Sequence, residues 1–184
     1  MFIQTESTPN PNAIKFLPGV TVNLDDPKYV TSSEDCNSAL ARKLFSLENI
    51  DGVFFGSDFI TITKSDSADW NSMKPQIIMV IMDHFLAGLP VFDNMETRRV
   101  VIDQETLNET EKQILEIIET KVRPSVAMDG GDIVYVGFED GVVLVELRGA
   151  CSGCPSSSLT LKKGIESMLQ HYVPSVKAVE AVNL

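Results

Sequence analysis

The stretch IVYVGFEDGVVLVELRGACSGCP, residues 133–155, determines the expected fold of the second half of the chain. Residues 133–138 and 142–147 are rich in β-branched and aromatic side chains, and Glu139-Asp140-Gly141 between them predicts a tight hairpin. Pro155 suits the first position of a helix, so a helix is expected from Pro155 to Tyr172. The stretch therefore predicts a hairpin, a loop with two cysteines, and a helix in that order.

The residues on either side extend this unit. Thr110, followed three residues later by Gln113, resembles a capping box and predicts the start of a helix. An amphipathic pattern continues from Ile114 to Val122 and is expected to stop near Arg123-Pro124, because proline removes a helical hydrogen bond. The other elements expected here are a turn at residues 129–132 and a last strand at residues 176–182.

The first half of the chain predicts another unit of strands and helices. Extended runs are expected at residues 2–8 and 13–17, separated by the proline-containing segment Thr8-Pro9-Asn10-Pro11-Asn12. Further along, the pattern predicts a helix at residues 37–47, a hairpin of residues 53–55 and 59–63, and a helix from about residue 68 to 86 with Asp69 as its cap.

Residues 91–108 are polar, show no strong periodicity, and are expected to form a linker. The predicted domains are therefore residues 1–90 and 109–184. Strands and helices occur in both, so the expected fold class is α+β, with two small domains that each pack a small sheet against helices.

Composition narrows the classes of partner and compartment. The 184 residues carry a net charge of −11 without a Lys or Arg cluster, so neither nucleic acid nor a membrane surface is an expected partner. The longest apolar run, Ile77 to Met82, is too short to span a bilayer. Residues 1–6 resemble neither a secretory signal nor an Arg-rich transit peptide. We therefore expect a bacterial cytoplasmic protein, with the mitochondrial matrix after processing as the alternative.

Cys151 and Cys154 form a C-x-x-C motif whose neighbours suit metal or redox chemistry. Thiolates bind metals, and two thiolates separated by two residues can hold one ion or cluster. Gly149 and Gly153 allow the backbone to wrap closely, and Pro155 starts a helix whose N-terminus favours negative charge. The motif alone leaves metal binding and dithiol redox chemistry open.

The number of cysteines limits how a metal site can be built. Zinc and the common iron–sulfur clusters usually take four protein ligands, whereas the chain has three cysteines, and the third, Cys36, lies far away in the first half. A thiolate site therefore requires two chains, and a symmetric dimer supplies Cys151 and Cys154 twice. Three hypotheses remain at this point: a cluster carrier, a dithiol oxidoreductase, and a zinc-bridged interaction dimer.

Two segments resemble a known family. Met128-Asp129-Gly130-Gly131-Asp132, together with residues 147–157 around the cysteines, is similar to the NifU-like C-terminal domain of the Nfu family. Thr5-Glu6-Ser7-Thr8-Pro9-Asn10-Pro11-Asn12-Ala13-Ile14-Lys15-Phe16 resembles the Nfu N-terminal domain. The two similarities are independent and together cover nearly the whole chain in the family's order.

The resemblance implies a scaffold or carrier, not an enzyme, that holds a [4Fe–4S] cluster between two subunits. Cys151 and Cys154 match the ligand positions of the family. The implied partners are a second copy of the chain, upstream cluster assembly proteins, and the apo iron–sulfur proteins that receive the cluster. The resemblance also suggests that the N-terminal domain helps to choose partners.

Other candidate residues have simpler interpretations. Cys36 is expected to be a small apolar or capping residue. His84 and His171 lack the neighbouring ligands of a metal site and are expected at helix ends or on the surface. Asp129 and Asp132 are candidates for acid–base chemistry, but the glycines between them favour a loop role.

Overall fold

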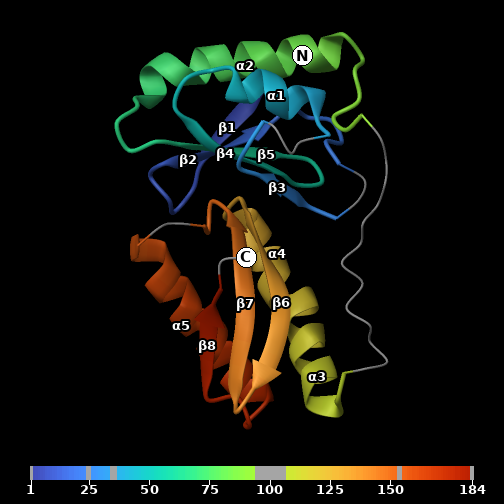
Figure 1. The fold of residues 1–184 in the computed structure, drawn as a ribbon, viewed down its shortest axis with the longest axis vertical. Helices are drawn as coiled ribbons and strands as arrows, with labels where there is room; N and C mark the ends of the chain where they lie inside the picture. The colour runs from blue at the N-terminus through green and yellow to red at the C-terminus, as the bar shows by residue number, and fades with distance from the viewer. Residues whose placement is uncertain (1, 24–25, 34–36, 94–106, 153–154, 183–184) are drawn as a thin grey trace. The chain divides into compact units, whose positions relative to one another are not determined.

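The structure is a computed structural model that describes residues 2–23, 26–33, 37–93, 107–152 and 155–182. The chain divides into two compact units, residues 1–98 and 99–184, which are treated separately below. Each unit combines one sheet with helices, so the expected α+β fold class is confirmed (Figure 1). Cys36, Cys154 and most of the predicted linker lie outside the described residues.

The first unit contains an antiparallel sheet of five strands in the order β1-β2-β5-β4-β3. The strands are β1 (Gln4–Ser7), β2 (Ala13–Leu17), β3 (Lys28–Val30), β4 (Ile50–Phe55) and β5 (Ile60–Lys64). Two helices, α1 (Ala39–Phe45) and α2 (Trp70–Leu86), cover the same face of this sheet (Figure 1). The sequence pattern predicted all of these elements except β3, which is too short to show periodicity.

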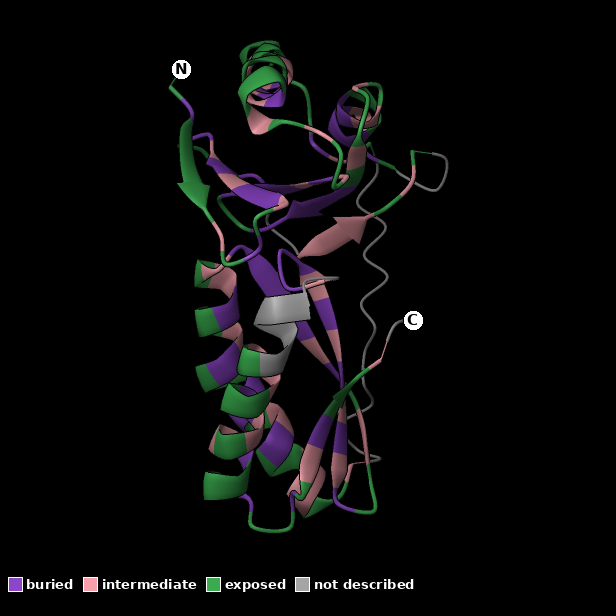
Figure 2. Cartoon of the chain, turned by 90° about the vertical axis from the view of Figure 1, so that its left-hand side faces the viewer, coloured by how far each residue is buried: buried purple, intermediate pink, exposed green. Residues whose placement is uncertain are grey.

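The core of the first unit lies between the central strands and the two helices. Phe16, Ile60 and Ile62 of the sheet have no exposed surface. Leu40 of α1 and Ile77 of α2 are equally buried and belong to the same cluster. Buried residues gather where sheet and helices meet in each unit (Figure 2).

The segment after α2 packs on this first core, although its residues fall in the predicted linker. Val91 is 7% exposed, and its carbonyl accepts a hydrogen bond of 2.5 Å from the Ser38 hydroxyl. The Ser38 side chain also accepts from the Ala41 N–H and so caps α1. Asp93 pairs with Arg42. Residues 91–93 are thus held to the start of α1.

The second unit has a three-stranded sheet in the order β6-β7-β8. The hairpin of β6 (Gly131–Glu139) and β7 (Val142–Gly149) turns through Asp140 and Gly141, whose φ angles of 52° and 90° match a type I′ turn. The last strand, β8 (Ala178–Ala181), pairs parallel to β7, so α5 (Pro155–Tyr172) forms the crossover between them. The predicted hairpin and the predicted bounds of α5 are confirmed.

The predicted end of the helix near Arg123-Pro124 is wrong. After α3 (Glu109–Ile117) the chain continues through a π-helical turn, η1 (Ile118–Val122), into α4 (Arg123–Met128). In a regular helix, the Pro124 ring would clash with the carbonyl of Thr120, four residues earlier. The wider turn before Pro124, in which the Arg123 N–H bonds to the Ile118 carbonyl, accommodates the ring.

The predicted capping box at Thr110 and Gln113 is also wrong. The cap is Asn108, whose side chain accepts a hydrogen bond from the Glu111 N–H at 3.0 Å. The Glu111 carboxylate accepts in return from the Asn108 N–H at 2.9 Å. Asparagine is preferred over threonine at this position, and the negative charge of Glu111 is favourable near a helix N-terminus. The helix therefore begins two residues before the predicted cap would allow.

Candidate functional site

The loop after β7 carries the first cysteine of the C-x-x-C motif. At Gly149, the last residue of β7, φ is 66°, in the left-handed region that glycine adopts at little cost. The Ala150 N–H then donates to the Gly130 carbonyl at 3.2 Å, and the Ser152 N–H donates to the Gly149 carbonyl at 3.0 Å. These bonds fold the loop back against the turn that precedes β6.

The Cys151 side chain points into the protein. Cys151 is 6% exposed and belongs to the hydrophobic core of the second unit. Five members of this core have no exposed surface at all: Ile114, Ile118, Ile133, Val143 and Leu169. Cys154 lies outside the described residues. The site is therefore described below from the surroundings of Cys151.

Gly131 lies directly beneath Cys151. A Cβ atom placed on Gly131 would lie 2.6 Å from Cys151 Sγ, 3.1 Å from Cys151 Cβ and 2.7 Å from the Arg148 carbonyl oxygen. All three distances are shorter than ordinary van der Waals contact. The space occupied by the Cys151 thiol therefore exists because residue 131 has no side chain.

Asp132, the second aspartate of Asp129-Gly130-Gly131-Asp132, holds the backbone next to Gly131 in place. Asp132 is 2% exposed, and its carboxylate accepts two hydrogen bonds from Arg123, at 2.7 Å from Nε and 3.0 Å from Nη2. Arg123 also donates to Glu119, and these carboxylates hold the pKa of Arg123 above its usual range. The start of β6 is thus joined to the junction of η1 and α4, which indicates a structural role for Asp132.

The sequence predicted a turn at residues 129–132, and the structure divides that segment. Asp129 and Gly130 form the turn, whereas Gly131 and Asp132 are the first residues of β6. Gly130 has a φ of 80°, which again favours glycine. The sequence offered no sign of the Arg123–Asp132 pair or of the contact between Gly131 and Cys151, because both depend on tertiary packing.

Comparison with known proteins matches both halves of the chain to one family. Residues 3–88 match the family described as scaffold protein Nfu/NifU N terminal, and residues 114–180 match the NifU-like domain. The protein named NFU1 iron-sulfur cluster scaffold homolog, mitochondrial, from Homo sapiens is 48% identical over 187 residues, which cover 99% of this chain and 72% of that protein. The chain belongs to the Nfu family. This confirms the resemblance stated from the sequence.

Other Nfu relatives are longer. The NFU1 homolog of Drosophila sechellia is 48% identical over 187 residues, and the chain spans 65% of its length. The Drosophila persimilis homolog is 49% identical over 189 residues, again with 65% of its length matched. A solution structure of a NifU-like protein from Saccharomyces cerevisiae shares 28% identity, with a TM-score of 0.47 over 51% of this chain and 86% of that one.

The two histidines of this Nfu chain lie in α2 and α5. His84, expected at a helix end or on the surface, has no exposed surface, and its Nε2 lies 3.1 Å from the Pro90 carbonyl oxygen. Burial lowers its pKa, and Nδ1 has no hydrogen-bond partner among the described residues. His171 lies at the end of α5 and stacks edge-on against Tyr172. Within the described ranges, no three His, Cys, Asp or Glu side chains are placed to hold a metal ion.

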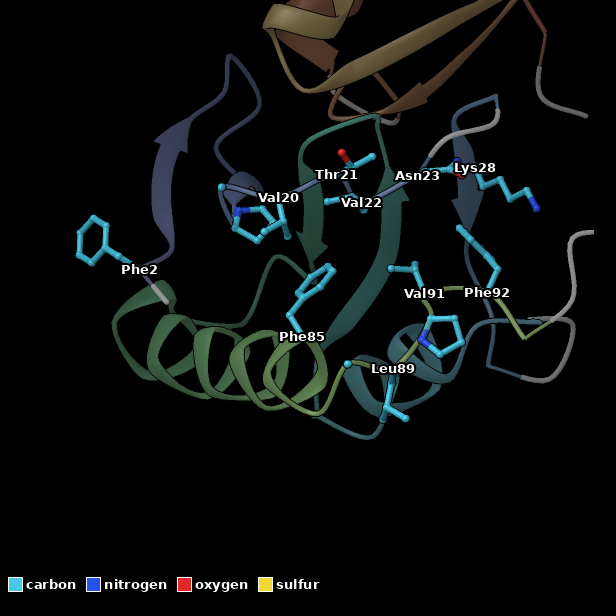
Figure 3. A pocket seen from close by; sticks show the side chains of 14 residues that line it. Phe2, Val20, Thr21, Val22, Asn23, Lys28, Phe85, Leu89, Val91 and Phe92 are labelled. Carbon is cyan, nitrogen blue, oxygen red and sulfur yellow. The ribbon is translucent and has the colours of Figure 1, made fainter.

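The first unit of this Nfu chain contains a cavity of about 810 Å³ that the sequence pattern did not predict (Figure 3). Its wall is mainly apolar and includes Phe85, Val91 and Phe92. Lys28 lies at its rim, with Nζ 4.3 Å from the centre of the Phe92 ring.

No helix in the described part of the chain is long and apolar enough to cross a membrane.

Proposed function

We propose that this chain is an iron–sulfur cluster carrier, and not an enzyme, that holds a [4Fe–4S] cluster between two copies and transfers it to apo target proteins. The cluster is the cargo of the protein. The observation that supports this best is the placement of Cys151 in the loop between β7 and α5, within a NifU-like domain. Relatives with 47–49% identity are named iron–sulfur cluster scaffold proteins.

The ligand set supports sharing between two chains. Each chain offers Cys151 and Cys154 as neighbouring thiolates, and a [4Fe–4S] cluster usually takes four. Two copies related by a twofold axis supply four thiolates from the same motif. Cys36 is separated from the motif by more than a hundred residues of sequence and belongs to the other unit.

The position of the loop suits a site that first binds a cluster and later releases it. A helix N-terminus stabilises negative charge, and α5 begins at Pro155, directly after Cys154 in the sequence. Binding within an interface leaves the cluster dependent on the association of the two chains. Separation of the copies would then release the cluster to a recipient with a more complete set of ligands.

The proposed compartment and partners follow from the relatives. The similar proteins from Homo sapiens and Drosophila are named mitochondrial, so we propose the mitochondrial matrix as the place of action. The expected bacterial cytoplasm gains no support from these relatives. The proposed partners are a second copy of the chain, upstream assembly proteins that load the cluster, and apo iron–sulfur proteins that receive it.

Anaerobic reconstitution with iron and sulfide tests this proposal. We expect about four irons and four sulfides per two chains. Cys151→Ala and Cys154→Ala should each abolish binding, while Cys36→Ala should bind as the wild type does. Zinc without sulfide in freshly isolated protein would support the zinc-bridged dimer instead. Reduction of insulin disulfides with turnover, by a protein that holds no iron, would support the dithiol oxidoreductase.

A further inference from the structure

We propose that Gly131 positions Cys151 in a stowed state, and that this thiol must swing out of the core before it can bind a cluster. The inference rests on the proposed function, since it concerns how the cluster ligand becomes available. It assigns a positioning role to a glycine that contacts Cys151 but has no side chain to bind anything itself.

The burial of Cys151 is the first observation. A cluster shared with a second chain lies outside this chain, so its thiolate ligands have to reach the protein surface. Cys151 is 6% exposed and packs within the apolar core of the second unit. The described conformation therefore protects Cys151 and does not present it.

The shape of the space is the second observation. Cys151 Sγ would lie only 2.6 Å from a Cβ on residue 131, so any side chain there would compete with the thiol for the same volume. Gly137, on the same strand, has open space around the corresponding position, with no atom within 4 Å. The close fit is thus specific to Gly131 and is not a general property of β6.

The third observation is that hydrogen bonds hold both the start of β6 and the beginning of the cysteine loop. Asp132, next to Gly131, is held by Arg123 through two hydrogen bonds, and the Ala150 N–H bonds to the Gly130 carbonyl. The start of β6 and the beginning of the cysteine loop are therefore held in place by these bonds. In the proposed movement the Cys151 side chain rotates outward while the sheet stays folded.

The first test measures thiol reactivity in the absence of iron. In a full-length Cys36→Ser, Cys154→Ser background, Cys151 is the remaining cysteine, and its reaction with an aromatic disulfide reagent can be followed directly. We expect the folded protein to react at least about tenfold more slowly than the urea-unfolded chain. Low urea concentrations should scarcely change the folded rate, because swinging out one side chain exposes little new surface.

Two results of this test would overturn the proposal. Reaction at the rate of the unfolded chain would show that Cys151 is not stowed. A rate that rises with urea as steeply as global unfolding would show that the thiol is exposed by loss of the whole unit, and not by a local swing.

The second test fills the space beneath the thiol. Gly131→Ala in the same background should raise the reaction rate about tenfold, because the new methyl group displaces the sulfur, while Gly137→Ala should leave the rate unchanged. Circular dichroism checks that both variants are folded. A folded Gly131→Ala protein that reacts as slowly as the wild type would contradict the role of Gly131. If that variant does not fold, the urea dependence of the unmodified site decides the proposal.

These outcomes are separable from the proposed function. Slow, urea-independent reaction of Cys151 in the test background, together with wild-type protein that takes up no iron on reconstitution, would remove the cluster-carrier proposal and leave the stowed thiol in place. Cluster binding by the wild-type protein, together with free reaction of Cys151 in the test background, would do the reverse.

Discussion

At the scale of single residues, the pair between Asp132 and Arg123 explains why an aspartate follows the two glycines beside Cys151. The carboxylate is almost fully buried and satisfies two donors of a guanidinium that is itself only 25% exposed. A buried charge without its partner is costly, so each member needs the other. The pair holds the start of β6 next to the cysteine loop.

Asp132→Asn should therefore destabilise the second unit. The substitution keeps the size of the side chain but removes the buried charged acceptor of Arg123, which keeps only the half-exposed Glu119 carboxylate, and we expect a loss of about 1–3 kcal/mol in unfolding free energy. Urea unfolding followed by far-UV circular dichroism measures this loss. Asp140→Asn, at an exposed turn, removes the same charge and should change stability by less than about 0.5 kcal/mol. Equal stability of the two variants would contradict the anchoring role.

His84 predicts a dependence of the first unit on pH. Its pKa is lowered by burial, so the native state binds fewer protons than the unfolded state once the pH falls below the ordinary histidine value of 6.5. Stability should be full above the ordinary histidine pKa and should fall as the pH drops below about 6.5. The single tryptophan, Trp70 of α2, reports urea unfolding of this unit by its fluorescence.

His84→Gln serves as the comparison, because glutamine can still donate to the Pro90 carbonyl but does not titrate. We expect the urea midpoint of this variant to change much less between pH 7 and pH 5. An unchanged slope with pH would show that burial of His84 has no measurable linkage to folding.

At the scale of elements, the start of α3 distinguishes the observed cap, Asn108, from the cap predicted from the sequence, Thr110. Asn108→Ala should cost about 1 kcal/mol, because it removes the acceptor for the Glu111 N–H. Thr110→Ala, at the predicted cap, should change stability by less than about 0.5 kcal/mol. Far-UV circular dichroism during urea unfolding measures both, and the reverse order of effects would restore the cap predicted from the sequence.

The elements that local chemistry determines were predictable from the sequence. The Asp140-Gly141 turn requires two left-handed residues, and Pro155 suits a helix start, so the hairpin and α5 were both found. The π turn before Pro124 was not, because a proline inside a helix and a proline after its end give the same local signal. Strand β3 depends on pairing with β4 and carries no periodicity of its own.

The features of the candidate site also fall into those that the sequence can predict and those that depend on tertiary packing. The sequence pattern predicts metal or dithiol chemistry at Cys151 and Cys154, and for a metal site the cysteine count predicts a second chain; both stay predictions. The burial of Cys151 and its fit over Gly131 were not predictable, because they join residues twenty positions apart through the packing of β6 against the loop after β7. Sequence spacing carries no measure of exposure.

At the scale of the whole molecule, the proposed function requires two copies of an acidic chain. Each copy has a net charge of −11, so association is opposed by repulsion that salt screens within about 10 Å at 0.1 M ionic strength. Four thiolate–iron bonds across the interface would have to overcome this repulsion. The proposal therefore predicts that the cluster joins the two chains and that its loss returns them to separate copies.

Native mass spectrometry of the reconstituted full-length protein tests this central claim most directly. We predict a species of two chains with four irons and four sulfides, which returns to single chains when the cluster is removed by a chelator. The Cys151→Ala protein, treated identically, should remain a single chain without iron. A complete cluster on one chain, or two chains joined by zinc without sulfide, would contradict the account.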